Sequence, residues 1–338
     1  MKYFLLILGS IAIISCGSNH ITRHNDSSIV TGEIATTFAN TITANDLKDH
    51  LYRIASDEFE GRETGEIGQK RAADYLKSFY IESGIASPYG GSDYFQSIPT
   101  EHLRESINPS ENVVAFIEGS KNPNEIIVIS AHYDHLGMNS GGIYYGADDD
   151  GSGTVAILEI AEAFKQAVSK GNGPKRSILF LHVTGEEKGL LGSKYYTNFP
   201  IFPLKNTVTN LNIDMIGRVD EAHTNNPNFV YLIGSDKLSS ELHDLSEEIN
   251  ARFTQLDLDY IYNEDDDPNR FYYRSDHYNF AKNNIPIIFY FNGTHEDYHK
   301  TSDTPDKINY ELLTKRTQLI FFTAWEIANR RQRIKVDQ

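Results

Sequence analysis

Histidine and carboxylate side chains gather in five short segments of this chain, and together they form the donor set of a divalent metal site. The segments are 130–135 (SAHYDH), 146–153 (GADDDGSG), 184–187 (TGEE), 212–215 (NIDM) and 297–299 (DYH). Imidazole nitrogens and carboxylate oxygens are common ligands of zinc and similar ions. The chemistry expected from such a set is metal-assisted hydrolysis, in which a metal lowers the pKa of a water and a base takes its proton.

The first segment offers a metal ligand and a group that can support it. His132 and Asp134 are two residues apart at the end of an expected strand, so their side chains point the same way. One of the two side chains can bind a metal while the other supports it, since a carboxylate that is hydrogen-bonded to the second imidazole nitrogen fixes the tautomer of the histidine. Taken alone, the pair is explained equally well by a histidine that caps a strand and an aspartate that opens a turn.

Three consecutive aspartates, Asp148, Asp149 and Asp150, lie in a Gly-rich loop before a helix expected to begin near Ser152. Adjacent carboxylates repel one another unless water or a cation neutralises them. One of the three is therefore a candidate to bridge two metal ions, and a solvated loop that caps the helix explains the others. The loop sequence does not show which residue bridges.

Two further acidic positions follow apolar runs. Glu186 and Glu187 come after a run expected to be a buried strand, where one carboxylate can bind metal while the other faces the substrate. Asp214 interrupts the apolar run 211–216, and a buried carboxylate is costly without a cation or several donors. His299 lies in a polar loop, and on its own it indicates no more than a structural group.

Short apolar runs alternate with segments of helical periodicity along most of the chain. Strands are expected at 112–117, 125–131, 177–183, 208–215, 229–234 and 285–291. Helices are expected at 45–55, 69–83, 152–167, 239–252 and 310–330. This alternation predicts an α/β fold, with a central, mostly parallel mixed β-sheet sandwiched between helices. Ligands of such sheets bind beyond the carboxyl ends of the strands, which is where the five segments fall.

Composition favours one catalytic domain over 41–338. The 338 residues are 39% hydrophobic, enough for one sizeable core, and they contain no internal repeat or convincing linker. The net charge of -16 argues against binding to nucleic acid, whose phosphates need a basic face. The acidic excess is either a solvated surface or a field that favours metal ions and peptide amino termini.

Residues 1–15 have the features of an export signal. Lys2 precedes an uncharged apolar run of about 13 residues, which is too short to span a bilayer. The run ends at Cys16, the single cysteine, in a pattern that resembles the lipobox of bacterial lipoproteins. The resemblance implies a lipidated amino terminus and a flexible tether over 16–40. We therefore expect an exported lipoprotein of the bacterial envelope, facing the periplasm or the cell surface and touching the membrane through its lipid alone. An ordinary cleaved signal with an incidental cysteine is the alternative.

The five segments occur in the order found in the co-catalytic zinc metallopeptidases, the family of the bacterial leucyl aminopeptidases, whose relatives include glutamate carboxypeptidases and glutaminyl cyclases. The resemblance covers nearly the whole mature chain, from 56–65 (SDEFEGRETG) through 273–277 (YRSDH) to 297–303 (DYHKTSD). No ligand position is missing. Segment 96–119 is too short for the protease-associated insert that some relatives carry.

The resemblance implies a zinc-exopeptidase fold with two zinc ions per chain. The implied ligands are His132 and Asp214 for one ion, Glu187 and His299 for the other, and Asp149 for both. Glu186 would be the general base for a hydroxide held by the two zincs, and Asp134 would orient His132. The substrate side of the pocket would be shaped by Ser275, Asp276 and His277. The histidines without a ligand role are His135, His182, His277 and His295, and His182 is expected in the core.

The implied activity is an aminopeptidase that acts on peptide substrates. A carboxypeptidase or other amidohydrolase on the same scaffold is one alternative. A glutaminyl cyclase-like acyltransferase with one zinc is another, and a non-catalytic peptide- or metal-binding lipoprotein is a third.

Overall fold

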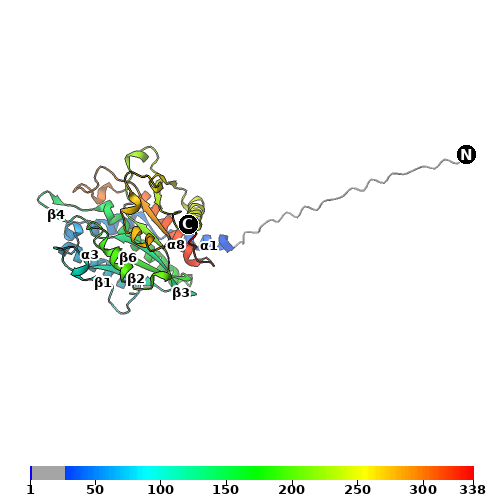
Figure 1. Cartoon of the computed structure of the whole chain (residues 1–338), viewed down its shortest axis with the longest axis horizontal. Coiled ribbons are helices and arrows are strands. Elements are labelled where there is room, and N and C mark those ends of the chain that lie inside the picture. The colour runs from blue at the N-terminus through cyan, green and yellow to red at the C-terminus, as the bar shows by residue number, and fades with distance from the viewer. Residues whose placement is uncertain (2–26) are drawn as a thin grey trace.

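The computed structural model describes Met1 and residues 27–338 (Figure 1). The predicted signal, Cys16 and the first part of the predicted tether therefore lie outside the described residues. Within the described part of the chain, no helix combines the length and the apolar character needed to cross a membrane.

A mixed sheet of eight strands runs through the domain. In spatial order the strands are β1 (Phe95–Ile98), β2 (Ser110–Ile117), β6 (Arg176–Val183), β3 (Asn122–His132), β7 (Thr207–Ile213), β10 (Ile287–Phe291), β8 (Phe229–Ile233) and β9 (Asp257–Asp259). The central strands β6, β3, β7 and β10 are parallel, whereas β2 and β8 run antiparallel to their central neighbours. The predicted fold class is confirmed. A separate hairpin pairs β4 (Met138–Asn139) with β5 (Gly142–Ile143).

Helices cover both faces of the sheet because its central strands are apolar on both sides. In β6, Ile178 and Phe180 face one core cluster, whereas Leu179 and Leu181 face the other. The helices over the first cluster are α1 (Ser27–Ala39), α2 (Ala44–Ile54), α3 (Ile67–Glu82), α4 (Gly153–Ser169), α6 (Ser240–Ile249) and α8 (Tyr310–Asn329). Those over the second cluster are α5 (Leu191–Asn198) and α7 (His277–Ala281).

Every strand and helix expected from the sequence is present, with ends shifted by a few residues. The helix expected at 239–252 leaves the α-helical form at Ile249 and continues as a wider turn over Asn250–Thr254. Apart from helix α1, the helices and strands that were not predicted are β1, β9, α5, α7 and the β4–β5 hairpin. All of them are short, and a segment of a few residues has too little periodicity for a helix or a strand to be predicted from it.

The structure corrects the end of the predicted tether, because Ser27–Ala39 forms helix α1. Ala35 and Phe38 are buried, and the ring of Phe38 stacks on Trp325 of α8 at a centroid distance of 5.8 Å. Serine, threonine and glycine give this segment a weak helical preference. Packing against α8, rather than local propensity, therefore stabilises α1.

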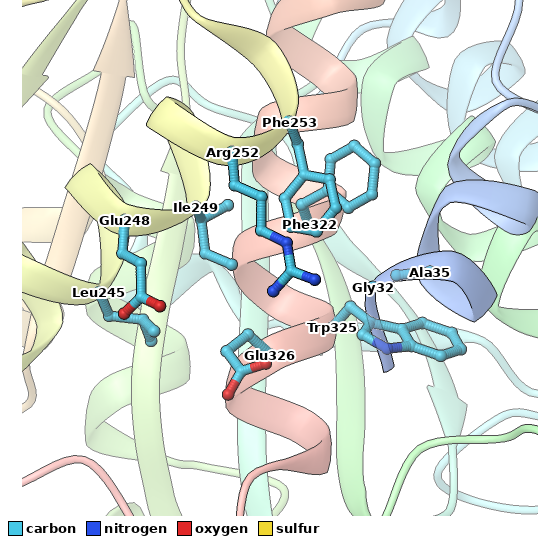
Figure 2. Close-up of a pocket in the computed structure, with 10 residues that line it drawn as sticks. All are labelled: Gly32, Ala35, Leu245, Glu248, Ile249, Arg252, Phe253, Phe322, Trp325 and Glu326. Atoms are coloured by element: carbon cyan, nitrogen blue, oxygen red, sulfur yellow. The ribbon is translucent and has the colours of Figure 1, made fainter. Parts of the chain in front are cut away.

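A cavity lies between α1, α6 and α8, away from the carboxyl ends of the strands (Figure 2). Arg176, the first residue of β6, donates a hydrogen bond to the carbonyl of Ile327 in α8 at 2.9 Å. The neighbouring part of α8, which lines the cavity, therefore lies near the amino end of this strand. In the cavity the guanidinium of Arg252 packs on α1, where a Cβ at Gly32 would lie 2.5 Å from Nη2. The arginine therefore rests directly on the helix backbone.

His182 is a core histidine, as predicted. It is fully buried in β6, and its Nε2 lies 2.7 Å from the hydroxyl oxygen of Tyr80. Burial lowers the pKa of the His182 imidazole to about 3, so the side chain is neutral in the folded protein at neutral pH.

We expect His182 to weaken the fold as pH falls. The unfolded chain takes up a proton near pH 6.5, whereas the folded protein takes it up near pH 3, so the free energy of unfolding decreases across this window as pH is lowered. In His182→Gln the amide oxygen can still accept the Tyr80 hydroxyl. Urea denaturation at several pH values should show a slope smaller by about one proton than in the parent protein. The surface variant His102→Gln should keep the parent slope, and an unchanged slope in His182→Gln would contradict the assignment.

Candidate metal centre

The parallel strands end at one edge of the sheet, and there they bring the predicted ligands together. His132 is the last residue of β3, Glu187 follows β6, Asp214 follows β7, and His299 lies in the loop after β10. Because these four strands are neighbours in the sheet, their carboxyl ends are adjacent.

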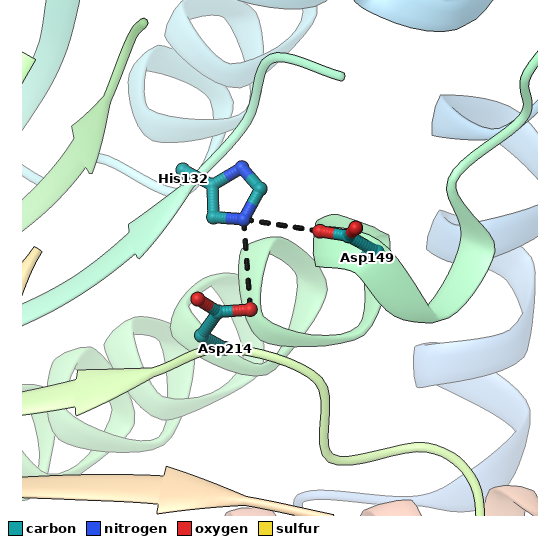
Figure 3. Close-up of side chains that lie close together, drawn as sticks. All are labelled: His132, Asp149 and Asp214. Carbon is teal, nitrogen blue, oxygen red and sulfur yellow. Dashed lines mark ion pairs between the residues drawn. The ribbon is translucent and has the colours of Figure 1, made fainter. Parts of the chain in front are cut away.

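A first group forms around His132. Its Nε2 lies 3.2 Å from Oδ1 of Asp149 and 3.6 Å from Oδ1 of Asp214 (Figure 3). All three side chains are buried. Their ligand atoms are close enough together to hold a single cation.

A second group forms on the other side of Asp149. Nε2 of His299 lies 3.0 Å from Oδ2 of Asp149 and 3.4 Å from Oε2 of Glu187. The two oxygens of Asp149 therefore face different groups, Oδ1 toward His132 and Oδ2 toward His299. This is the arrangement of a carboxylate that can bridge two cations.

A second imidazole reaches the same place. Nδ1 of His135 lies 2.9 Å from Oε1 of Glu187 and 3.8 Å from Oδ2 of Asp149, and these three residues also form a group that could hold a cation. His135 is fully buried, whereas His299 lines the open cavity. Sequence reasoning gave His135 no ligand role, and its position three residues after His132 was the only signal that could have indicated one.

Hydrogen bonds distinguish the three consecutive aspartates. Oδ1 of Asp148 accepts the N–H of Gly217 at 2.7 Å, and Oδ1 of Asp150 accepts the N–H of Met215 at 3.0 Å. Both carboxylates thus fasten the chain that follows β7. Among the described residues, no backbone N–H donates to the carboxylate of Asp149, so of the three aspartates this one has its oxygens free of backbone donors.

Asp303 holds the backbone of the aspartate loop. Its carboxylate accepts the N–H of Asp148 at 3.0 Å and that of Asp149 at 3.2 Å, and its carbonyl accepts the N–H of Ala147 at 3.2 Å. Burial and the charge of Asp148 raise the pKa of Asp303 to about 6. Because Asp303 lies four residues after His299, it ties the loops of two ligands together. Sequence reasoning assigned it no role.

Asp134 supports the site differently from the prediction. Nδ1 of His132 lies 3.0 Å from the backbone carbonyl oxygen of Asp134 but 3.8 Å from its carboxylate. The carboxylate instead accepts the hydroxyl of Thr64 at 2.7 Å and the N–H of Glu186 at 3.2 Å. The main chain of Asp134 therefore orients the imidazole, while its side chain fixes the backbone of Glu186.

Glu186 is half-buried and lines the cavity beside His132 and Asp214. Burial raises the pKa of Glu186 well above its ordinary value; the charge of His132 opposes the shift, and Asp214 and Asp276 add to it. A carboxyl group with a raised pKa is suited to take a proton and return it near neutral pH.

The cavity beside the ligands holds about 380 Å³ of space, including the part open to solvent. Ser275 lines this cavity, whereas Asp276 and His277 are fully buried and do not. Asp276 accepts a hydrogen bond from the hydroxyl of Ser193, and Nε2 of His277 lies 2.8 Å from the carbonyl oxygen of Tyr272. The remaining lining residues are Met215, Phe271, Arg274, Phe289, Phe291, Thr294 and Tyr298.

Arg62 is a fully buried cation behind the metal centre. Its guanidinium donates hydrogen bonds to four backbone carbonyls, those of Ile54, Tyr133, Tyr145 and Gly146. Gly146 has φ +53, and a Cβ there would lie 2.5 Å from the ring of His135, so the loop requires glycine at this point. Burial lowers the pKa of Arg62, and the charges of Asp149 and Asp303 oppose that shift.

Replacing Arg62 by Leu should destabilise the fold strongly. The substitution leaves four carbonyls without their donor, and each buried unsatisfied group costs about 1–3 kcal/mol. We expect urea denaturation of the metal-free protein to show a loss of roughly 3 kcal/mol or more. Arg53→Leu removes an exposed ion pair with Glu58 and should cost less than about 1 kcal/mol. Equal losses in the two variants would show that Arg62 is not a structural clamp.

The donor set fits divalent metal ions. Oδ2 of Asp149 and Oε1 of Glu187 are buried without a well-aligned hydrogen bond. Burial works against a charged imidazole at His299, yet Asp149 and Glu187 raise its pKa to about 10. The cluster thus attracts positive charge, and imidazole with carboxylate is a common ligand set for zinc. Since metal must displace these protons, its affinity should fall at low pH.

Residues 112–324 match peptidase family M28, and the chain belongs to this family.

Individual relatives resemble the chain over different lengths. It is 45% identical to a vacuolar membrane protease of Verticillium alfalfae over 85 residues, which are 25% of this chain and 8% of that protein. It is 28% identical to leupeptin-inactivating enzyme 1 of Streptomyces exfoliatus over 265 residues, or 77% and 51% of the two chains. The LapA aminopeptidase of Legionella pneumophila has the same fold, with a TM-score of 0.69 and 23% identity over 89% of this chain and 76% of that one. The chain spans less than two thirds of the curated relatives it matches first.

Proposed function

We propose that the protein is an aminopeptidase that removes residues from the amino end of peptides and holds two zinc ions. The observation that carries this proposal is the placement of Asp149, whose two oxygens face two separate ligand groups. His132 and Asp214 would hold one ion, and Glu187 and His299 the other. We place His135 in support of Glu187, because it is buried away from the cavity.

The residues around the centre have distinct roles in peptide hydrolysis. Zinc at this site would acidify a water and polarise the scissile carbonyl. Glu186 would take the proton of the attacking water and pass it to the leaving amine. Asp134 and Thr64 would keep that base in place through the backbone N–H of Glu186. The apolar wall, which includes Phe289, would receive the side chain of the residue being removed.

A panel of matched peptides tests the activity. Zinc-loaded protein should cleave peptides with a free amino terminus and should fail on the same peptides once that terminus is acetylated. Elemental analysis of the active protein should find two zinc ions per chain. Cleavage that persists on the blocked peptides would move the assignment to a carboxypeptidase or other amidohydrolase. One zinc per chain with formation of pyroglutamate from glutaminyl peptides would indicate a glutaminyl cyclase-like enzyme.

We also propose that the mature protein is a lipoprotein of the bacterial envelope, lipidated at Cys16. The lipobox-like pattern before this single cysteine supports the proposal. In a bacterial host, the full chain should incorporate a labelled fatty acid and sediment with membranes, and Cys16→Ser should do neither. Labelling that survives in Cys16→Ser would refute it.

A further inference from the structure

Arg274 is an exposed cation in the wall of the metal cavity. Its guanidinium lies over the ring of Phe271, 5.2 Å from the centroid. Although the chain contains 47 acidic residues, no carboxylate in the described part of the chain forms an ion pair with Arg274. Its charge is therefore available to a ligand in the cavity.

The backbone that carries Arg274 is fixed on both sides. The carboxylate of Asp267 accepts the N–H of Phe271 at 2.9 Å, and the carbonyl of Phe271 accepts the N–H of Arg274 at 3.0 Å. On the other side, the hydroxyl of Ser275 accepts a hydrogen bond from the Asn212 amide at 3.0 Å. The side chain is thus presented from an ordered loop, which lowers the entropy cost of using it to bind a ligand.

The rest of the cavity limits what this cation can recognise. Met215, Phe289 and Phe291 make an apolar wall, and Thr294 adds a neutral hydroxyl. The other basic side chains that line the cavity are the two histidines already assigned to the metals. A planar guanidinium pairs best with a carboxylate, which it can bind through two parallel hydrogen bonds.

We propose that Arg274 binds a carboxylate of the substrate and so directs the enzyme toward peptides that carry this group close to the scissile bond. The inference rests on the proposed peptidase function. Two sources have the required chemistry, an acidic side chain on the residue being removed and the terminal carboxylate of a dipeptide. In both cases the apolar wall accommodates the aliphatic part of the substrate.

Two substrate pairs that differ only in this charge test the proposal. The first is glutamyl against glutaminyl p-nitroanilide, and the second is the dipeptide Leu-Ala against its amide. In the parent protein we expect kcat/KM to favour the carboxylate in at least one pair by about tenfold or more, the range of a charge-assisted hydrogen bond. Arg274→Gln should reduce that ratio to near one, and Arg274→Lys should keep part of it. A ratio within one variant is unaffected by differences in folding or zinc content.

Arg270→Gln is the matched control. Arg270 lies on the same loop and stacks on Tyr273 at 4.9 Å, but it does not line the metal cavity. Its ratios should equal those of the parent protein. A loss of preference in the glutamyl pair identifies the side chain as the source, and a loss in the dipeptide pair identifies the terminus. Parent ratios near one in both pairs, or ratios that survive in Arg274→Gln, would overturn the proposal.

The proposed peptidase function fails separately, if none of the four substrates is hydrolysed. Calorimetry of zinc-loaded protein with free glutamate and glutamine would still test Arg274 in that case. The dipeptide Leu-Ala and its amide would be compared in the same way. In at least one pair the ligand with the extra carboxylate should bind more tightly to the parent protein and not to Arg274→Gln, and equal binding by the parent within both pairs would overturn the inference.

Discussion

Replacing Glu186 by Gln is expected to lower kcat at least 100-fold while the protein keeps its zinc. The amide cannot take a proton from the attacking water, and general acid–base catalysis contributes roughly 100- to 10,000-fold. The substitution preserves shape, and the backbone N–H of residue 186 can still donate to Asp134, which it does at 3.2 Å. Glu186 is not placed among the metal ligands, so zinc content and the unfolding midpoint should change little.

The measurement combines steady-state kinetics with elemental analysis of the same preparation. Glu58→Gln is the control, because it makes the same chemical change at an exposed carboxylate that pairs with Arg53. It should retain parent kinetics. If Glu186→Gln kept more than about a tenth of the parent kcat, another group would have to be the base.

Asp149→Asn should have an equally large effect, but through loss of metal. Asp149 offers one oxygen to the group of His132 and the other to the group of His299. Asparagine has a single carbonyl oxygen and no charge, so it cannot serve both ions. We expect fewer than two zinc ions per chain after dialysis and a fall in kcat/KM of at least 100-fold, since the metals supply most of the charge stabilisation.

The neighbouring aspartate provides the contrast. Oδ1 of Asp150 accepts the N–H groups of Gly153 at 2.9 Å and of Met215 at 3.0 Å. Asp150→Ala leaves both donors unpaired and should reduce the unfolding free energy by about 1–3 kcal/mol for each. Two zinc ions retained by Asp149→Asn, or an Asp150→Ala protein as stable as the parent, would show that the roles of the two aspartates are assigned wrongly.

The fold could be predicted because its central elements are long and apolar. The 177–183 run is buried on both faces, so its sequence alone indicates a central strand, and the ligand segments follow such strands. The end of the tether could not be predicted, because α1 depends on the contact of Phe38 with Trp325, which is far away in the sequence. Local sequence carries no record of such a partner.

The types of residue in the candidate site could be predicted from the sequence, but the residues that hold its loops in place could not. Spacing placed the carboxylates at strand ends but left open which of the three aspartates bridges. The family resemblance implied Asp149, and the hydrogen bonds of Asp148 and Asp150 now give a physical reason for that choice. Arg62 and Asp303 act on backbone groups that are remote in sequence, so a pattern of residue types cannot reveal them. The same holds for His135, whose approach to Glu187 depends on how two loops meet.

Arg62 and Asp303 fix the ligand-bearing loops with hydrogen bonds that involve no metal. Removal of the metal by a chelator should therefore abolish the proposed activity without unfolding the protein, in contrast to small domains that fold only around their ion. In surroundings poor in zinc, the chain would remain as a folded but inactive apoprotein, and renewed binding of the ion would restore its activity without new synthesis.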